Sequence, residues 1–204
     1  MKTYLNGLKF GMLLQIAIGP MCLMVFSTAQ NAGFPHAMAF VLAVTLVDAF
    51  YIALAALGIS RLLENENRKK ALRLIGGLVL IAFGAGIALS VFGIDILPGL
   101  GIQTDSSSIF IQGLIMTLSN PLTIVFWGSV LTAKIADEGL KKGDLASFSC
   151  GAVSATVLFM TCVAALGTVL STFLPDRAAA GLNLLVGLLI VFFGLRMLMR
   201  RSDS

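Results

Sequence analysis

The sequence predicts an all-α membrane protein with six transmembrane helices, arranged as a 3+3 inverted repeat. Three observations lead to this fold class. Of the 204 residues, 58% are hydrophobic and only 12% are charged, which is more apolar surface than a soluble domain of this size could bury. Six apolar stretches each reach the roughly 20 residues that a helix needs to cross a bilayer. Short motifs of the first three stretches return in the same order in the last three.

Polar connectors separate the six expected spans. The stretches are about twice as long as the strands of a membrane barrel and lack their alternation of polar and apolar residues, so strands are excluded. We expect spans at residues 4–28, 37–60, 72–93, 109–132, 145–170 and 179–199. Together they form a single transmembrane domain over residues 1–204, with one repeat half at 1–95 and the other at 106–204.

Basic side chains give the orientation of the spans. One side of the predicted topology carries Lys2, Arg61, Arg68, Lys69, Lys70, Arg73, Lys134, Lys141, Lys142, Arg196, Arg200 and Arg201. The other side has only Arg177, while Lys9 lies within the first span and can extend back to the basic side. Because cytoplasmic loops are enriched in Lys and Arg, both termini are predicted to lie in the cytoplasm.

Three motif pairs predict the internal repeat. "GLVLIAFG" at 77–84 returns as "GLLIVFFG" at 187–194, "AALG" at 55–58 returns at 164–167, and "IGP" at 18–20 matches "SNP" at 119–121. Each half has three spans, and an odd number makes the halves cross the membrane in opposite directions. Such inverted repeats are common in secondary transporters, where helices interrupted by Gly or Pro at corresponding positions mark the substrate site.

Pro20 and Pro121 interrupt the first and fourth expected spans. A proline inside a helix costs about 3 kcal/mol and frees a carbonyl, here that of Ile16 or Thr117, which a neighbouring helix, water or a ligand must satisfy. The preceding residues are Gly19, which allows close approach to the backbone, and Asn120, which adds an amide. Polar residues nearby are Gln15, Thr117, Ser119 and Thr123. We expect a substrate site here; the alternative is a pair of kinks that only shape packing.

Asp48 lies near the middle of the second expected span. A carboxylate there costs about 2.5–3.5 kcal/mol, so it should face the bundle interior or a watery cavity. The repeat places Val157 or Leu158 at the equivalent position, so the acid belongs to one half only. Asp48 is expected to carry a proton or to pair with a substrate ammonium group; the alternative is a hydrogen-bonded side chain that holds helices together. Lys9 is a candidate ion partner, although its position fits snorkelling better.

Several function classes lack support in the sequence. No phosphate-binding glycine motif is present, and the basic residues are spread over short connectors, so neither ATP nor nucleic acid is an expected partner. His36 is alone and is expected in a loop, and Cys22, Cys150 and Cys162 have no metal-ligand spacing. We therefore expect no enzyme, no cofactor and no metal site.

Three alternatives to organic-substrate transport stay open. An exporter of heavy-metal or other inorganic ions would need the carboxylate, Cys or His cluster that the sequence lacks. A membrane thiol–disulfide electron carrier would need paired cysteines in the first and fourth spans, but the repeat mate of Cys22 is Thr123. A membrane scaffold without transport activity would not explain an acid at midspan.

The order of these motifs resembles the LysE/RhtB family of amino-acid exporters. The resemblance rests on "GP" early in the first span, Asp48 in the second, "NP" in the fourth preceded by Phe110 and Gly113, and "GLLIVFFGLRML" near the end. It implies six helices in a bacterial inner membrane and efflux of amino acids or similar small metabolites. Carried over position by position, it favours a site made of Gly19, Pro20, Asp48, Asn120 and Pro121.

Two departures from the family pattern keep the substrate open. The family usually has "PGP" where this chain has "IGP", and often more glycines where this chain has "PHAMAFVLAV". We expect alternating access around a midplane site, in which backbone N–H groups at a half-helix start meet the substrate carboxylate. Proton antiport through Asp48 would offset the roughly 2.3 kcal/mol per charge and per 100 mV that export of a cation costs. The lipid bilayer is the other expected partner, and a homo-oligomer is left open.

Overall fold

The computed structural model describes residues 2–16, 19–56, 66–94, 105–120, 123, 127, 131 and 142–199. Its described elements are the helices α1 (Lys2–Ile16), α2 (Pro20–Ala32), α3 (Phe34–Ala56), α4 (Glu66–Ser90), α5 (Ser106–Leu118), α7 (Lys142–Phe173) and α8 (Asp176–Met199). Every regular element in these ranges is a helix, so the all-α prediction is confirmed for the described part of the chain.

Three described helices are long and apolar enough to cross a membrane. They are Phe34–Ala56, Gly143–Phe173 and Arg177–Met199, and they correspond to the second, fifth and sixth expected spans. Leu74–Ser90 and Ser106–Leu118 are shorter apolar helices within the third and fourth expected spans. The first and fourth expected spans are interrupted, as the two prolines predict.

The first span breaks into α1 and α2 around Gly19. Gly19 is the N-cap of α2, with an extended backbone at φ −104° and ψ 168°, and Pro20 occupies the first turn. A proline is well tolerated there, because the first N–H groups of a helix have no intrahelical partner. The carbonyl of Gly19 accepts hydrogen bonds from the N–H groups of Cys22 at 3.1 Å and Leu23 at 3.4 Å. Pro20 therefore starts a new helix and does not merely kink a continuous one.

The fourth span breaks at the corresponding place. α5 ends at Leu118, and the N–H of Ser119 donates to the Ile115 carbonyl at 2.9 Å. The N–H of Asn120 donates to the Thr117 carbonyl at 3.1 Å. Pro121 has no N–H to donate to this carbonyl, and the turn at the helix end supplies the donor in place of the expected neighbouring helix, water or ligand. The N–H of Thr123 donates to the Asn120 carbonyl at 3.3 Å. Pro121 lies outside the described residues.

These two breaks share one hydrogen-bonding feature. In each, the residue before the proline, Gly19 or Asn120, accepts a bond from the N–H three residues later, Cys22 or Thr123. The same turn around the proline position therefore occurs in both halves of the chain.

Asp105 begins α5 from the connector that precedes it. Its carboxylate accepts the Ser108 N–H at 2.9 Å and so caps the helix. This backbone hydrogen bond lowers the pKa of the exposed Asp105 carboxyl, as stabilisation of the charged form requires. Asp105 is itself exposed to solvent.

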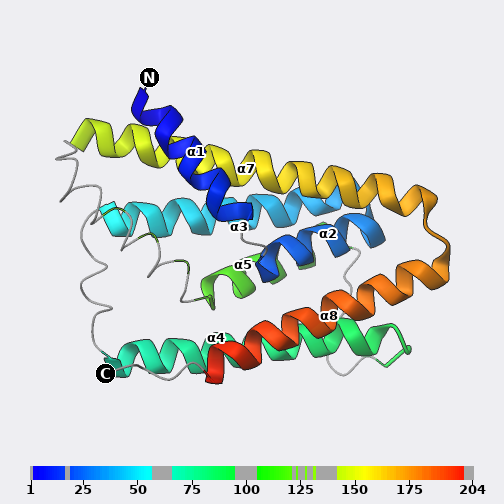
Figure 1. Cartoon of the computed structure of the whole chain (residues 1–204). Coiled ribbons are helices and arrows are strands. Elements are labelled where there is room, and N and C mark those ends of the chain that lie inside the picture. Colours follow the sequence, from blue (N-terminus) through cyan, green and yellow to red (C-terminus); the bar gives the residue numbers. More distant parts are fainter. Residues whose placement is uncertain are drawn as a thin grey trace.

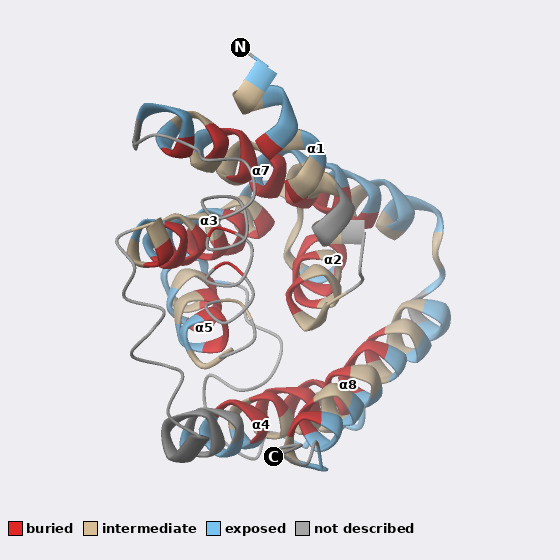
Figure 2. Cartoon of the chain, turned by 60° about the vertical axis from the view of Figure 1, so that its left-hand side comes forward, coloured by how far each residue is buried: buried red, intermediate tan, exposed pale blue. Residues whose placement is uncertain are grey.

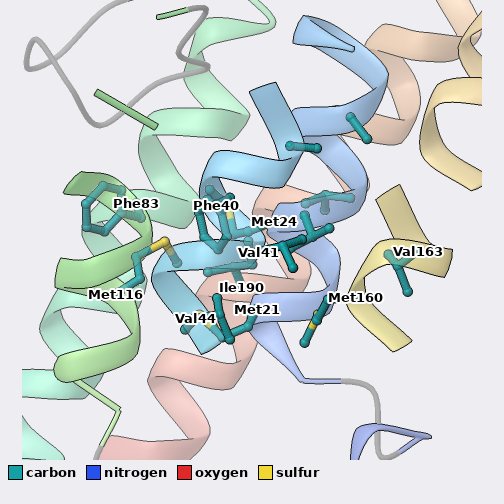
Figure 3. Packing of buried hydrophobic residues seen from close by; sticks show 14 of the residues in the cluster. Met21, Met24, Phe40, Val41, Val44, Phe83, Met116, Met160, Val163 and Ile190 are labelled. Carbon is teal, nitrogen blue, oxygen red and sulfur yellow. The ribbon is translucent and has the colours of Figure 1, made fainter. Parts of the chain in front are cut away.

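The helices form a layered bundle (Figure 1). The long helices α3 and α7 pack together, α1 packs on α7, α5 packs on α3, and α2 packs on both long helices. α4 and α8 pair with each other, and α8 also contacts α2. The main core lies between these elements and includes Met21, Phe40, Met116, Met160 and Ile190 (Figure 3).

Buried residues gather where helices face one another, and exposed residues cover their outer sides (Figure 2). Many of the exposed residues are large and apolar; on α8 they are Leu185, Leu188, Phe192, Leu195 and Met199. A stripe of this kind would be unfavourable in water but suits contact with lipid tails.

Glycines make the contact between α4 and α8. A Cβ added at Gly84 would lie 2.7 Å from the Gly187 carbonyl oxygen, and one at Gly187 would lie 2.7 Å from the Gly84 carbonyl oxygen. At the other end, a Cβ on Gly194 would lie 2.8 Å from the Gly77 carbonyl oxygen. These four glycines end the two repeated motifs, so the motifs pack against each other in antiparallel fashion. Small residues at such positions let helix backbones approach closely in a membrane.

Substitution of a glycine in this contact should destabilise the protein. We expect Gly84→Ala or Gly187→Ala to cost about 1–3 kcal/mol, because the added methyl group would meet backbone atoms that cannot turn away. Thermal unfolding of the purified protein in detergent measures this as a lower midpoint. Gly181→Ala is the matched control on α8, since nothing lies within 4 Å of its added Cβ. Equal midpoints for Gly187→Ala and Gly181→Ala would contradict the role of the glycine contact.

Candidate functional site

Asp48 is buried within α3, with 6% of its surface exposed. Its Oδ2 accepts a hydrogen bond from the hydroxyl of Thr156 on α7 at 3.0 Å. Thr156, which is 1% exposed, in turn accepts a bond from Nε2 of Gln15 on α1 at 2.8 Å. One chain of hydrogen bonds therefore joins α1, α7 and α3 through the predicted acid.

Hydrogen counting gives this chain a direction. A threonine hydroxyl has a single proton, and an amide nitrogen only donates. With Gln15 Nε2 donating to the Thr156 oxygen, the Thr156 proton is available for Asp48. The oxygen of Asp48 that faces Thr156 is therefore an acceptor.

Tyr51 lies one turn after Asp48 on α3 and is also buried. Its hydroxyl donates to the Leu118 carbonyl at 2.8 Å. Leu118 is the last residue of α5, and carbonyls at a helix end have no intrahelical donor. Tyr51 thus satisfies a backbone group that the break in the fourth span leaves open.

Thr117 connects the two breaks. It is 1% exposed, and its hydroxyl donates to the Gly113 carbonyl at 2.7 Å and contacts the sulfur of Met21 at 3.5 Å. Met21 follows Pro20 in the first turn of α2. The end of α5 therefore lies against the start of α2, and Figure 3 shows Met21 among core residues such as Val44 and Ile190.

The predicted site residues fall into two groups, and contacts join the members within each group. Gln15 reaches Asp48 through Thr156, and Thr117 reaches the α2 turn that Gly19 and Pro20 begin. Asn120 is half-buried just after α5, and Pro121 is not among the described residues.

Two secondary expectations also have outcomes. Lys9 is exposed on α1, which fits snorkelling, and the hydrogen-bond partner of Asp48 in the described part of the chain is Thr156. The sequence predicts a loop at His36, but the structure places this residue in the first turn of α3.

Sequence reasoning missed Thr156. The repeat alignment pointed to Val157 or Leu158 opposite Asp48, but these side chains are 37% and 49% exposed, while the residue just before them faces inward. A polar residue in an apolar span was the available signal. That signal alone could not show which face of α7 turns toward the acid.

A second polar cluster, also missed, joins α2 to α8. Oδ1 of Asn183 accepts bonds from the Ser27 hydroxyl at 2.8 Å and from Nδ2 of Asn31 at 2.9 Å. Nδ2 of Asn183 donates back to Oδ1 of Asn31 at 2.8 Å. Gln30, one turn after Ser27, is buried, and both of its amide atoms lack a hydrogen-bond partner among the described residues. The cluster holds α8, and with it α4, to the rest of the bundle.

A family model described as LysE type translocator matches residues 12–201. The chain belongs to this family. The resemblance expected from the motifs is thereby confirmed, and the apolar helices fit a membrane protein of this transporter family. No solved structure matches the chain.

One similar protein is the "Putative amino acid efflux protein YcgF" of Bacillus subtilis (strain 168). It is 28% identical over 199 residues, which cover 95% of this chain and 94% of the relative. The similarity to this relative therefore extends over nearly the whole of both proteins.

The contact between Asn31 and Asn183 should be measurable as a coupling energy. We expect Asn31→Ala and Asn183→Ala each to lower the free energy of unfolding, by about 0.5–2 kcal/mol. Asn31→Ala leaves Nδ2 of the buried Asn183 without this partner, and Asn183→Ala removes the side chain that both Ser27 and Asn31 bond. The double variant should cost little more than one single variant. Unfolding in mixed micelles measures the cycle, and the exposed Asn6→Ala serves as control. Strictly additive effects would contradict the reciprocal bond.

Proposed function

We propose that the protein is a secondary transporter that exports amino acids or closely related small metabolites across the bacterial inner membrane by alternating access. Family membership and the efflux name of the relative support transport of this substrate class. The observation that carries the proposal is the meeting of two interrupted helices, where Thr117 at the end of α5 contacts Met21 at the start of α2. Interrupted helices that meet inside a bundle are the usual substrate site of secondary transporters.

The 3+3 inverted repeat is part of this proposal. Exchange of the two halves would turn the contact of Gly77 with Gly194 into that of Gly187 with Gly84, and both contacts are present. The same exchange relates α1 on α7 to α5 on α3, and both pairs pack.

Small residues line these two related helix pairs. A Cβ at Gly11 of α1 would lie 3.0 Å from the Ala152 carbonyl oxygen of α7, and one at Gly113 of α5 would lie 2.9 Å from the Ala43 Cβ of α3. A transporter built in this way can rock one set of helices against the other around a central site.

The start of α2 offers a place for the substrate carboxylate. No side chain caps this helix, and the positive end of the dipole at the start of its backbone favours an anion. In the proposed site, Gly19 and Pro20 present this backbone, and Gln15, Asp48 and Thr117 surround it. Asn120 and Pro121 form the second break.

Asp48 is the proposed coupling group. An ionised carboxylate at this position can pair with the substrate ammonium group or carry a proton in the opposite direction. Export of a net cation against an inside-negative potential costs about 2.3 kcal/mol per charge and per 100 mV, and inward movement of a proton would offset it. Because the acid is in one half only, it provides coupling without a symmetric counterpart.

Both termini are proposed to lie in the cytoplasm. The start of α1, the start of α4 and the end of α8 lie toward the same end of the molecule (Figure 1). Basic residues of the sequence gather in the segments next to these helix ends, as the positive-inside rule requires of a cytoplasmic face.

The acid and the substrate class are tested together in proteoliposomes. Vesicles with purified protein are loaded with a mixture of labelled amino acids and given an inward proton gradient. We expect efflux of a subset of them, and we expect Asp48→Asn to reduce gradient-driven efflux at least about tenfold, because the neutral amide cannot take up the proton. Asp144→Asn, at an exposed acid in the first turn of α7, is the matched control. Equal gradient-driven efflux from Asp48→Asn and wild type would refute the coupling role.

The breaks are tested by restoring helix-forming residues. Pro20→Ala and Pro121→Ala return the N–H that a continuous helix needs, and we expect each to slow efflux, with a larger loss in the double variant. Insertion into the membrane is checked by size-exclusion chromatography of each variant. Pro35→Ala, at an exposed position in the first turn of α3, is the control. Normal rates in a correctly inserted double variant would exclude a broken-helix site.

A further inference from the structure

The link between Asp48 and the first break consists of two side chains. Gln15 is the penultimate residue of α1, and among the described residues the Thr156 hydroxyl joins it to Asp48. Thr156 and Asp48 are 1% and 6% exposed. Because bulk water is largely excluded, these bonds depend mainly on one another and on the charge of the acid.

Small residues make up much of the seam around this link. α1 lies on α7 through glycine and alanine. A Cβ added at Gly11 would lie 2.6 Å from the Ala155 Cβ and 3.0 Å from the Ala152 carbonyl oxygen, and one added at Gly151 would meet the backbone at Tyr4. Such contacts hold two helices close but have little preference along the seam. The bond of Gln15 to Thr156 is directional, so it specifies where the end of α1 sits on α7.

We propose that Thr156 and Gln15 transmit the charge of Asp48 to the break in the first span. An ionised Asp48 holds the end of α1 on α7, and uptake of a proton by Asp48 releases it. Both are positioning residues, because neither is the group that binds the proton. The inference rests on the proposed function, in which that proton drives export.

The strength of the bonds explains the hold. A hydroxyl that donates to a carboxylate makes a charge-assisted bond, roughly twice as strong as a neutral one. Donation also polarises the Thr156 oxygen and makes it a better acceptor for the Gln15 amide. The charge on Asp48 therefore strengthens both bonds of the chain.

Proton uptake weakens the chain at either carboxyl oxygen. If the proton adds to Oδ1, Thr156 still donates to Oδ2, but the bond is neutral. If it adds to Oδ2, the acid becomes the donor to one lone pair of the Thr156 oxygen, and Gln15 can still donate to the other. Thr156 then no longer donates to a charged group, so its oxygen is a weaker acceptor and the bond that holds α1 is weaker. A proton therefore binds to Asp48 more tightly when the end of α1 is loose than when it is held on α7, and such a difference in affinity is what a ligand needs to shift the balance between two states.

Other titratable groups near the chain are few among the described residues. Tyr51 is one turn from Asp48 on α3, and its hydroxyl is held by the Leu118 carbonyl. The remaining titratable side chains described on α3 and on the helices packed around this chain are the half-buried Tyr4, Cys22 and His36 and the exposed Lys2, Lys9, Asp144, Cys150 and Cys162. Asp48 is thus the acid whose charge changes the strength of the hydrogen bonds between Gln15, Thr156 and Asp48.

Hydrogen–deuterium exchange of the last turn of α1 tests this without any substrate. In purified wild-type protein, we expect exchange there, corrected for the intrinsic effect of pH, to become about tenfold faster as pH falls through the titration of Asp48. Thr156→Val removes the hydroxyl at nearly constant volume, and should give fast exchange at every pH. Thr156→Ser restores the hydroxyl and should restore the pH dependence.

Two controls make the result specific. Thr172→Val is the same substitution on the same helix, at an exposed hydroxyl that bonds its own helix at Val169, and should behave as wild type. Asp48→Asn should abolish the pH dependence. The proposal would be overturned if exchange in the wild-type protein did not depend on pH. It would also be overturned if a correctly folded Thr156→Val variant kept the pH response.

The pH profile of efflux separates this proposal from the proposed function. If the proposal holds, the midpoint of the profile moves to higher pH in Thr156→Val, because the ionised acid has lost a donor. An unchanged midpoint, in a Thr156→Val variant that still exports, would overturn the proposed role of Thr156 and Gln15 but would leave the proposed transport function intact. Absence of any amino-acid efflux from wild type, with the exchange pattern as expected, would refute the proposed function and leave the proposed role of Thr156 and Gln15 intact.

Discussion

The need to satisfy backbone groups in the absence of water underlies most of this structure. A break in a membrane helix frees N–H and carbonyl groups that hydrocarbon cannot solvate. The chain has two such breaks, and it places them against each other and against polar side chains of the long helices. Tyr51 satisfies the Leu118 carbonyl at the end of α5, and the short turns at Gly19 and Asn120 satisfy others within the backbone itself. The start of α2, which no side chain caps, is the proposed place for the substrate carboxylate.

The long helices are the reason that both breaks can be held. α3 carries Asp48 and Tyr51 on one face, one turn apart, and α7 carries Thr156 opposite. Through these residues, each long helix is bonded to an interrupted helix: α7 to the end of α1, and α3 to the end of α5. A change in the charge or position of α3 would therefore be felt at both breaks. This arrangement links a single acid to the proposed site, which is built from two different parts of the chain, as the proposed coupling requires.

Glycines and side-chain amides have different roles in the packing of the helices. Glycines bring α1 onto α7 and α4 onto α8 at distances that no larger side chain allows. These seams are apolar and weakly directional, so hydrogen bonds define position along them. Gln15 does this for α1, and the reciprocal pair of Asn31 and Asn183 does it for the α4 and α8 pair. The outer surfaces need no such specificity, because lipid covers them.

The sequence by itself determined the helical class, three of the long spans and the location of both breaks. These features are local: a run of apolar residues sets a span, and a proline ends a helix wherever the chain folds. It also predicted that Asp48 faces the interior of the bundle, because an acid in an apolar span is costly in any packing arrangement. Only the tertiary structure decided that Thr156, and not its neighbours Val157 and Leu158, meets this acid, and that Asn31 meets Asn183. Those choices depend on how far each helix is rotated about its axis, and that rotation is set by the glycine contacts between helices distant in sequence.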